Sequence, residues 1–187
     1  MMNGEKTTFI KFFAAVDGNS INPLMNVVDQ KLREGVQRLV ILISSTGGSV
    51  FHGLSAHNFL KGLPVEIETH NFGSVDSIGV VLFLAGSKRY SVPDARFLIH
   101  PVTWGFNGNL RLEDKQIEET LKSLRIDTEN IAAVIAAGTQ KEEKEIIKAM
   151  HDRTTLSPEQ AQDFGLVHEI KPHLLPPGAE LISINMS

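Results

Sequence analysis

Three residues that lie far apart in the chain, Ser77, His100 and Asp152, have side chains and positions suited to chemistry. Ser77 stands at the head of an apolar run in GSVDSIGVV, where a strand-to-helix turn would place its hydroxyl at the positive end of a helix dipole. His100 ends the apolar stretch ARFLIH, so it is predicted at the end of a strand, where open α/β sheets place functional groups. Asp152 precedes a capped helix. A hydroxyl with a histidine base suits acyl transfer.

Each of these residues also has a purely structural interpretation. Ser77 and the neighbouring Asp76 are good helix N-caps, because their side-chain oxygen atoms accept free N–H groups of a first turn. His100 could be a hydrogen-bonded residue at a strand edge, and Asp152 a local backbone acceptor. Taken one at a time, the residues leave both interpretations open.

A second turn carries the diglycine of Thr46-Gly47-Gly48, which permits positive φ and close approach of another backbone. If the fold brings the two turns together, the amides of Gly48 and Ile78 could both donate to one carbonyl oxygen near Ser77, as acyl transfer requires. The alternative meaning of the diglycine is a tight turn.

The rest of the chain alternates strand and helix patterns. Apolar or β-rich strands are predicted at 7–16, 38–44, 64–72, 88–93, 95–100 and 166–170. Helices are predicted at 22–35, 50–61, 110–137, 141–152 and 158–164, with a turn plus buried helix over 73–86. This alternation predicts an α/β fold built from βαβ crossovers.

Two segments in the second half stand apart from this pattern. Residues 110–137 form one long Glu-, Lys- and Leu-rich helical stretch without glycine or proline, which is expected to project from the body and mediate assembly. The tail, 172–187, is interrupted by prolines and is expected either to pack on a neighbour or to be mobile.

Composition narrows the class of protein. With 187 residues, 42% of them apolar, the chain is predicted to form a single domain, 1–187. A net charge of −4 with interspersed signs argues against nucleic acid and anionic membranes as partners. There is no cysteine, secretory signal or membrane-length apolar run, so a cytoplasmic protein is expected. No cofactor or metal is expected; His52 and His57 lack metal-pair spacing and are predicted to face solvent or cap a helix.

Three blocks, taken in order, resemble a known family. ISSTGGSVFHGLSAHNFL, GSVDSIGVVLFLAGSKRYSVPDARFLIHP and HDRTTLSPEQAQDFGLVHEI are similar to the successive signature blocks of the Clp protease proteolytic subunit (ClpP) family, over roughly residues 8–170. The resemblance implies a ClpP/crotonase-type βαβ superhelical core with a protruding handle helix. It also implies a serine endopeptidase that hydrolyses small or unfolded polypeptides inside an oligomeric chamber.

The resemblance assigns a role to each candidate residue. It implies that Ser77 is the nucleophile, His100 the general base and Asp152 the residue that orients the base. It places the oxyanion hole at the amides of Gly48 and Ile78.

The same resemblance implies how substrate and subunits are held. A peptide would be bound by β-augmentation along Gly47 and Ser49 on one side and Val102 and Thr103 on the other. The helix at 110–137 would join subunits into a homo-oligomeric ring or stacked rings.

The chain departs from the family pattern at several places. Thr46 replaces a proline, and Val75 and Asp76 replace two small residues before the nucleophile. Trp104 and Phe106, in PVTWGFNGN, are expected to shape a substrate pocket or an interface. The short N-terminus has no obvious counterpart of the hairpin that meets the ATPase ring, so an ATPase unfoldase partner stays open.

Two other functions therefore remain as alternatives. One is a non-catalytic scaffold subunit of a mixed ring. The other is a crotonase-type acyl-CoA enzyme, which shares the two-amide oxyanion hole but uses carboxylates as acid and base, a role for which Asp76 could be recruited.

Overall fold

The structure is a computed structural model that describes residues 6–105 and 111–185. Strands and helices alternate along the chain, as the sequence predicts. The strands are β1 Thr7–Phe13, β2 Arg38–Ser45, β3 Glu66–Asp76, β4 Lys88–Ser91, β5 Arg96–Leu98, β6 Thr155–Leu156, β7 Glu169–Ile170 and β8 Leu181–Asn185. The helices are α1 Gly18–Arg33, α2 Val50–Lys61, α3 Ile78–Phe83, α4 Asp114–Thr139, α5 Glu143–His151 and α6 Pro158–Phe164.

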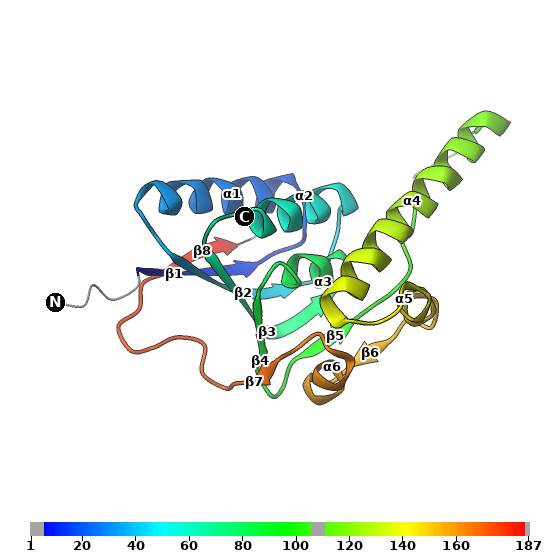
Figure 1. Cartoon of the computed structure of the whole chain (residues 1–187). Coiled ribbons are helices and arrows are strands. Elements are labelled where there is room, and N and C mark those ends of the chain that lie inside the picture. The colour runs from blue at the N-terminus through cyan, green and yellow to red at the C-terminus, as the bar shows by residue number, and fades with distance from the viewer. Residues whose placement is uncertain (1–5, 106–110, 186–187) are drawn as a thin grey trace.

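The strands form one sheet in the order β6-β5-β3-β2-β1-β8, with β4 branching from β3 to pair with β7. All pairs are parallel except β5 with β6. Helices α1, α2 and α3 cover one face of this sheet (Figure 1). The predicted α/β fold with βαβ crossovers is confirmed.

The core lies between the sheet and these helices. In β2, Leu39, Ile41 and Ile43 point into it and are completely or almost completely inaccessible to solvent. The intervening residues of the strand are also largely buried, which explains why the segment reads as an unbroken apolar run rather than an alternating one.

Helix α1 begins four residues earlier than predicted. Asp17 is the N-cap: its Oδ1 accepts from the amides of Asn19 at 2.8 Å and Ser20 at 3.1 Å. Pro23, which would stand in the first turn of a helix that began at residue 22, lies inside the helix. The prediction was wrong because the capping aspartate determines where the first-turn amides are satisfied, whereas one proline removes only one later hydrogen bond.

Strand β3 is longer than predicted, and the structure corrects the interpretation of Gly73–Asp76 as a turn. These residues continue the strand beyond a bend, and the strand changes partner there. Its first part pairs with β4 and its last three residues pair with β5. The chain then turns at a single residue, Ser77, into α3, whose residues Ile78–Phe83 are all buried.

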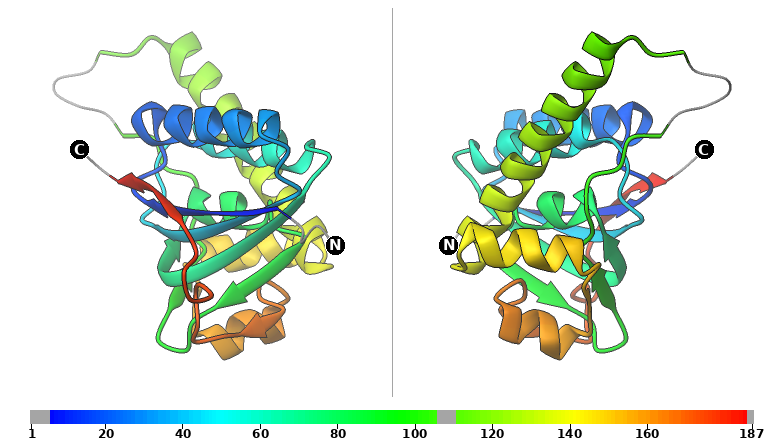
Figure 2. Two further views of the ribbon diagram at one scale, coloured as in Figure 1. Left: turned by 90° about the vertical axis from the view of Figure 1, so that its left-hand side faces the viewer. Right: turned by 90° about the vertical axis from the view of Figure 1, so that its right-hand side faces the viewer.

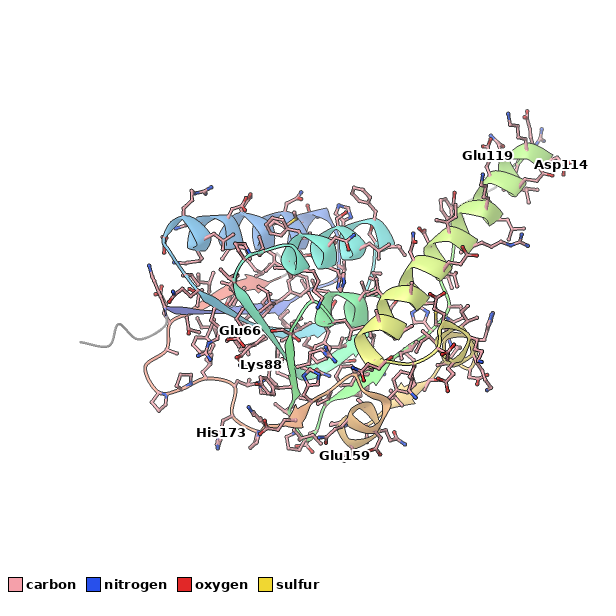
Figure 3. All side chains as sticks on the ribbon, viewed as in Figure 1. Glu66, Lys88, Asp114, Glu119, Glu159 and His173 are labelled. Atoms are coloured by element: carbon pink, nitrogen blue, oxygen red, sulfur yellow. The ribbon has the colours of Figure 1, made fainter. Side chains whose placement is uncertain are left out.

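Helix α4 projects away from the sheet, with Asp114 and Glu119 at its distant end (Figures 1 and 3). It corresponds to the helix predicted over 110–137, of which Leu110 lies outside the described residues. Its outer half exposes large apolar side chains, including Ile117 and Leu121. None of the helices in 6–105 and 111–185 combines the length and apolarity needed to cross a bilayer.

The tail closes the chain's own sheet. After β7 it crosses to the opposite edge, where β8 pairs in parallel with β1, from Phe9 opposite Leu181 to Phe13 opposite Asn185 (Figure 2). The expectation that the tail is mobile is therefore wrong for residues 181–185, which form a strand of the chain's own sheet. The apolar side chains of LISIN supply the missing edge strand, a role that the preceding prolines concealed.

Candidate active site

Ser77 occupies a sharply strained turn between β3 and α3. Its backbone has φ 60° and ψ −132°, a conformation that residues with a Cβ atom rarely adopt. Its amide donates to the carbonyl of Leu98 at 2.8 Å, and its own carbonyl accepts from Val80 at 3.0 Å. The side chain makes no capping hydrogen bond, so the interpretation of Ser77 as a side-chain cap is wrong. The hydroxyl remains available for chemistry.

The diglycine turn lies directly against this serine. A Cβ atom on Gly47 would come within 2.5 Å of the Ser77 Cβ, and one on Gly48 within 2.4 Å of the Val16 carbonyl oxygen. Val16 fixes the turn by donating to the Gly47 carbonyl at 2.8 Å and accepting from Ser49 at 2.7 Å. Only glycine fits both positions, which gives the diglycine a specific packing reason.

Two backbone amides beside Ser77 are unused. In the part of the chain that the structure describes, neither the Gly48 amide nor the Ile78 amide donates to a protein acceptor. Ile78 is the first residue of α3, where amides have no partner within the helix. Both residues line the same pocket as Ser77, so both amides are available to a ligand near the hydroxyl.

His100 follows β5 and opens into this pocket. Its Nδ1 lies 2.7 Å from the carbonyl oxygen of Pro101. A carbonyl oxygen only accepts hydrogen bonds, so Nδ1 carries the proton and donates it. In the neutral imidazole, Nε2 therefore holds a lone pair and is the basic nitrogen.

Asp152 lies outside the pocket. It is the C-cap of α5, and its half-exposed carboxylate pairs with Lys148 one turn earlier rather than with His100. The backbone nevertheless places this segment beside the histidine, because the Ile99 amide donates to the Thr154 carbonyl at 2.9 Å. The structure thus brings Ser77 and His100 together and leaves Asp152 adjacent but separately paired.

The pocket itself is small, with a volume of about 60 Å³ and a lining of both polar and apolar groups. Val102 and Thr103, predicted to bind substrate, line it, whereas Gly47 and Ser49 flank it without lining it. Phe106 lies outside the described residues, and Trp104 is exposed. The complete lining is Gly48, Val50, Ser77, Ile78, Ile99, His100, Pro101, Val102, Thr103, Ile131 and Ile135.

Sequence reasoning missed the contribution of α4 to this pocket. Ile131 and Ile135 lie one turn apart on the inner half of that helix and are almost fully buried. Their i, i+4 spacing marks an apolar face but not what the face contacts. Only the tertiary fold shows that it closes one wall of the pocket.

A larger hollow of about 500 Å³ lies over the ends of β1 and β2. Its lining residues are Phe13, Ala14, Ala15, Ser44, Ser45, Thr46 and Ser74. None of them is a titratable group, so the hollow lacks an acid or a base. The smaller pocket, which holds a hydroxyl, an imidazole and two unused amides, is the better candidate for chemistry.

Asp76 points away from the candidate site. Its Oδ1 accepts from the Ser74 hydroxyl at 2.8 Å and its Oδ2 from Arg96 at 2.7 Å, and it does not line the pocket. It caps no helix, and its charge is matched by the guanidinium. The acyl-CoA alternative, for which this carboxylate could be recruited, therefore gains no acid or base from Asp76 in this structure.

His57 corrects a second expectation. It is buried under α3 rather than facing solvent, with Nδ1 2.8 Å from the Val81 carbonyl oxygen, and burial lowers its pKa. Gly53 permits this close packing, since a Cβ there would lie 2.2 Å from Cγ1 of Ile78. His52 is half-buried, and its Nδ1 lies 3.0 Å from the hydroxyl of Ser49, which is itself the N-cap of α2.

Comparisons with known proteins agree with this architecture. The Clp protease family model matches residues 15–173. The ATP-dependent Clp protease proteolytic subunit of Deinococcus radiodurans is 29% identical over 154 residues, covering 81% of this chain and 72% of that protein. The solved structure of a ClpP1 point mutant from Listeria monocytogenes superposes with a TM-score of 0.78 at 25% identity, covering 90% of this chain and 92% of the other. The α/β sheet is thus of the ClpP/crotonase type, and the chain belongs to the Clp protease family.

Proposed function

We propose that this chain is a serine endopeptidase that hydrolyses small or unfolded polypeptides. The observation that supports this best is the strained turn at Ser77, which presents a hydroxyl without a capping partner to the pocket that also holds His100. Strain of this kind persists only where the surrounding structure enforces it, and it gathers at functional sites.

The chemistry follows from the positions of these groups. Ser77 Oγ attacks the substrate carbonyl carbon while its proton passes to Nε2 of His100. The carbonyl oxygen, now negative, accepts from the amides of Gly48 and Ile78. His100 then gives the proton to the leaving amine as the carbon–nitrogen bond breaks, and water hydrolyses the resulting ester to restore the serine.

Asp152 completes the triad by exchanging partners. Its present pair with Lys148 is largely exposed, and pairs of this kind contribute roughly 0–1 kcal/mol. Asp152 would replace the Pro101 carbonyl as the acceptor for Nδ1–H of His100. Both acceptors select the same tautomer, so the exchange requires no proton to move between ring nitrogens.

Substrate binding and assembly extend the proposal. A peptide strand would pair with Val102 and Thr103 at the pocket and with the turn around Gly47 and Ser49. The exposed apolar side chains of α4 suit contacts with further copies of the chain, as a homo-oligomeric ring or stacked rings. Light scattering of the purified chain should therefore show a multimer, and a strict monomer at micromolar concentration would contradict this part.

Reaction with a fluorophosphonate tests the nucleophile. Ser77 Oγ should displace fluoride and form an oxygen–phosphorus bond, which mass spectrometry locates on the peptide containing residue 77. Ser77→Ala should abolish labelling, and Ser87→Ala, at a serine outside the pocket, should not. Labelling that survives Ser77→Ala would place the nucleophile elsewhere.

The partners of His100 and Asp152 also favour a second candidate, the non-catalytic scaffold subunit. In the described residues their side chains are joined to Pro101 and Lys148 rather than to each other. A scaffold would assemble with an active partner subunit and remain unlabelled by the probe in every assembled species. Labelling at Ser77 in any species would exclude it.

A further inference from the structure

We propose that Asp76 and Arg96 form a positioning pair that holds the catalytic turn at Ser77 in its strained conformation. The inference rests on the proposed function for its catalytic part. Asp76 is the residue directly before the turn, at the last position of β3. Its side chain is 8% exposed, and the carboxylate is engaged through both oxygen atoms, by Ser74 and by Arg96.

The pair connects the two strands that meet at the turn. Ser74 lies opposite Arg96, and Asp76 lies opposite Leu98, in the parallel pairing of β3 with β5. The Arg96 guanidinium reaches two residues along this pairing to Asp76. The ladder then continues one residue further, where the Ser77 amide donates to Leu98. The side-chain pair therefore braces the last backbone bond before the chain departs from the sheet.

The backbone of Arg96 is held in place by the side chain of Asn71. The buried side chain of Asn71 donates from Nδ2 to the Arg96 carbonyl at 2.9 Å, and its Oδ1 accepts from the Gly73 amide at 3.0 Å. Asn71 thus ties the bend of β3 to the start of β5. The guanidinium is thus carried by the first residue of a strand paired with β3 rather than by a loop.

The opposite side of the turn is closed by packing. The Gly47 backbone packs closely against the turn, since a Cβ at Gly47 would lie 2.8 Å from the Asp76 carbonyl oxygen and 2.5 Å from the Ser77 Cβ. Relaxation of the positive φ of Ser77 would therefore need movement at Asp76. A carboxylate held at both oxygens opposes that movement, which is what storage of backbone strain requires.

The first experiment measures the fluorophosphonate reaction of the full chain, separating the maximal labelling rate from the probe's binding constant. Asp76→Asn keeps the side-chain shape but removes the charge that holds Arg96. A displacement of the hydroxyl of about 1 Å can cost about 100-fold, so we expect a 10- to 100-fold lower maximal rate with an unchanged binding constant. Arg96→Met should give a similar loss, and Arg96→Lys should restore part of it.

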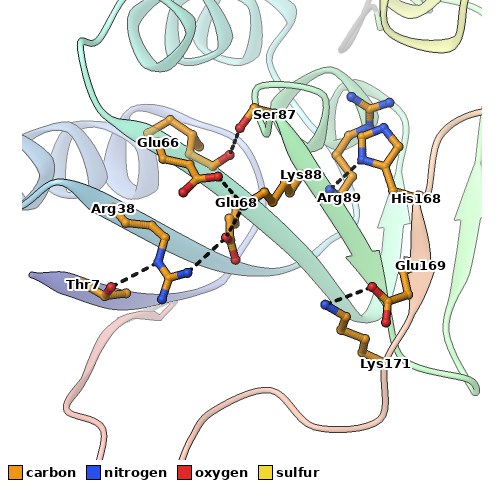
Figure 4. A network of polar contacts seen from close by, with 11 residues as sticks. Thr7, Arg38, Glu66, Glu68, Ser87, Lys88, Arg89, His168, Glu169 and Lys171 are labelled. Carbon is orange, nitrogen blue, oxygen red and sulfur yellow. Dashed lines mark hydrogen bonds and ion pairs between the residues drawn. The ribbon is translucent and has the colours of Figure 1, made fainter. Parts of the chain in front are cut away.

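A matched control exists on the same strand. Glu68 is also a buried carboxylate, paired with Arg38 at 3.4 Å and Lys88 at 3.7 Å (Figure 4). It lies near the start of β3, at the other end of the strand from Asp76. Glu68→Gln should reduce stability without changing the labelling rate by more than about twofold. If Asp76→Asn does not fold, the Arg96 variants keep the test decisive, since that side chain is half exposed.

The second experiment needs no catalysis. Glycine adopts the Ser77 backbone conformation without strain, so Ser77→Gly should stabilise the wild-type background more than the Asp76→Asn background. Effects on the unfolded chain cancel in this comparison. The factor by which Ser77→Gly changes the unfolding equilibrium constant should differ by about fivefold or more between the two backgrounds. Fivefold corresponds to the smallest strain energy typical of such residues.

The outcomes separate the two ideas. If the wild type reacts but Asp76→Asn and Arg96→Met react equally fast, the positioning pair is overturned while the proposed function stands. If the wild type does not react, the proposed function fails, and the stability comparison decides alone. Additive effects of Asp76→Asn and Ser77→Gly then overturn the pair, and a coupling of the expected sign supports it.

Discussion

Arg89 is a buried cation at the junction of β4, α4 and α6. Its replacement tests whether its hydrogen bonds stabilise the C-terminal end of α4. The residue is 7% exposed. Its guanidinium donates to four carbonyl oxygen atoms, those of Leu166 at 2.7 Å, Gly138 at 2.8 Å, Gly165 at 3.1 Å and Gly86 at 3.3 Å. Three of these lie in or just after the ends of α4 and α6, where helix dipoles place partial negative charge.

The magnitude of the Arg89→Met effect follows from these contacts. A hydrogen bond to a charged group contributes about 1.5–3 kcal/mol, and two of the four are short. Methionine recovers part of the loss, because it fills space and removes the cost of burying a charge. We expect a net loss of about 3 kcal/mol in the free energy of unfolding. For a chain of this length that lowers Tm by roughly 6–12 °C.

Urea denaturation followed by circular dichroism, at one protein concentration, would measure this loss. Arg89→Lys should lie between wild type and Arg89→Met, since an ammonium group cannot reach four divergent carbonyls. Arg33→Met makes the same chemical change at an exposed position and should alter stability by no more than about 0.5 kcal/mol. A stability of Arg89→Met within that range, or above wild type, would refute the view that these carbonyls depend on Arg89.

Three further predictions concern other parts of the molecule. Lys148→Gln should free Asp152 and raise the rate of peptide hydrolysis by up to about fivefold, the factor that corresponds to the free energy of an exposed ion pair. A decrease in that rate would show that the lysine does not compete with His100 for Asp152. Burial lowers the pKa of His57 and His70, so the folded chain binds these two protons less readily than the unfolded chain. Thermal melts should therefore show stability falling as pH drops below about 6.5, and a flat profile from 7 to 5 would contradict this. Deletion of 181–185 should lower Tm in the same assay, because it exposes the edge of β1; an unchanged Tm would mean that β8 contributes nothing.

Much of the fold could be predicted because its signals are local. The start of α6 was readable from Ser157 and Gln160, whose capping box is present, and its end from Gly165, which adopts positive φ. The strand β2 was readable from one apolar run. In contrast, the pairing of β8 with β1 joins residues more than 160 positions apart, and no local pattern specifies such a partner. The pocket wall supplied by α4 was missed for the same reason.

The residues of the candidate site also differ in how far the local sequence predicts their contacts. Ser77 was predictable as a candidate because it stands at a strand-to-helix turn before an apolar run, and His100 because it ends an apolar stretch. Strand ends in parallel sheets gather at one edge, and both residues line one pocket. Asp152 lies at the end of α5, outside the parallel part of the sheet. Its present ion pair with Lys148 joins two exposed side chains. Such contacts depend on rotamers, which differ little in energy at the surface. A sequence can therefore place the segment beside the histidine without determining the hydrogen bond.

The position of Asp76 shows how an error in one element becomes an error in chemistry. With Gly73–Asp76 interpreted as a turn, the carboxylate could point at the nucleophile and oppose an oxyanion. Once these residues are recognised as strand, alternation of side chains places Val75 and Asp76 on opposite faces, and the cross-strand position of Arg96 supplies the opposite charge. A charged residue next to a nucleophile in sequence is then a neighbour in the chain but not in the pocket. Whether the Asp76 carboxylate faces the nucleophile therefore depends on where β3 ends, and not on the type of residue alone.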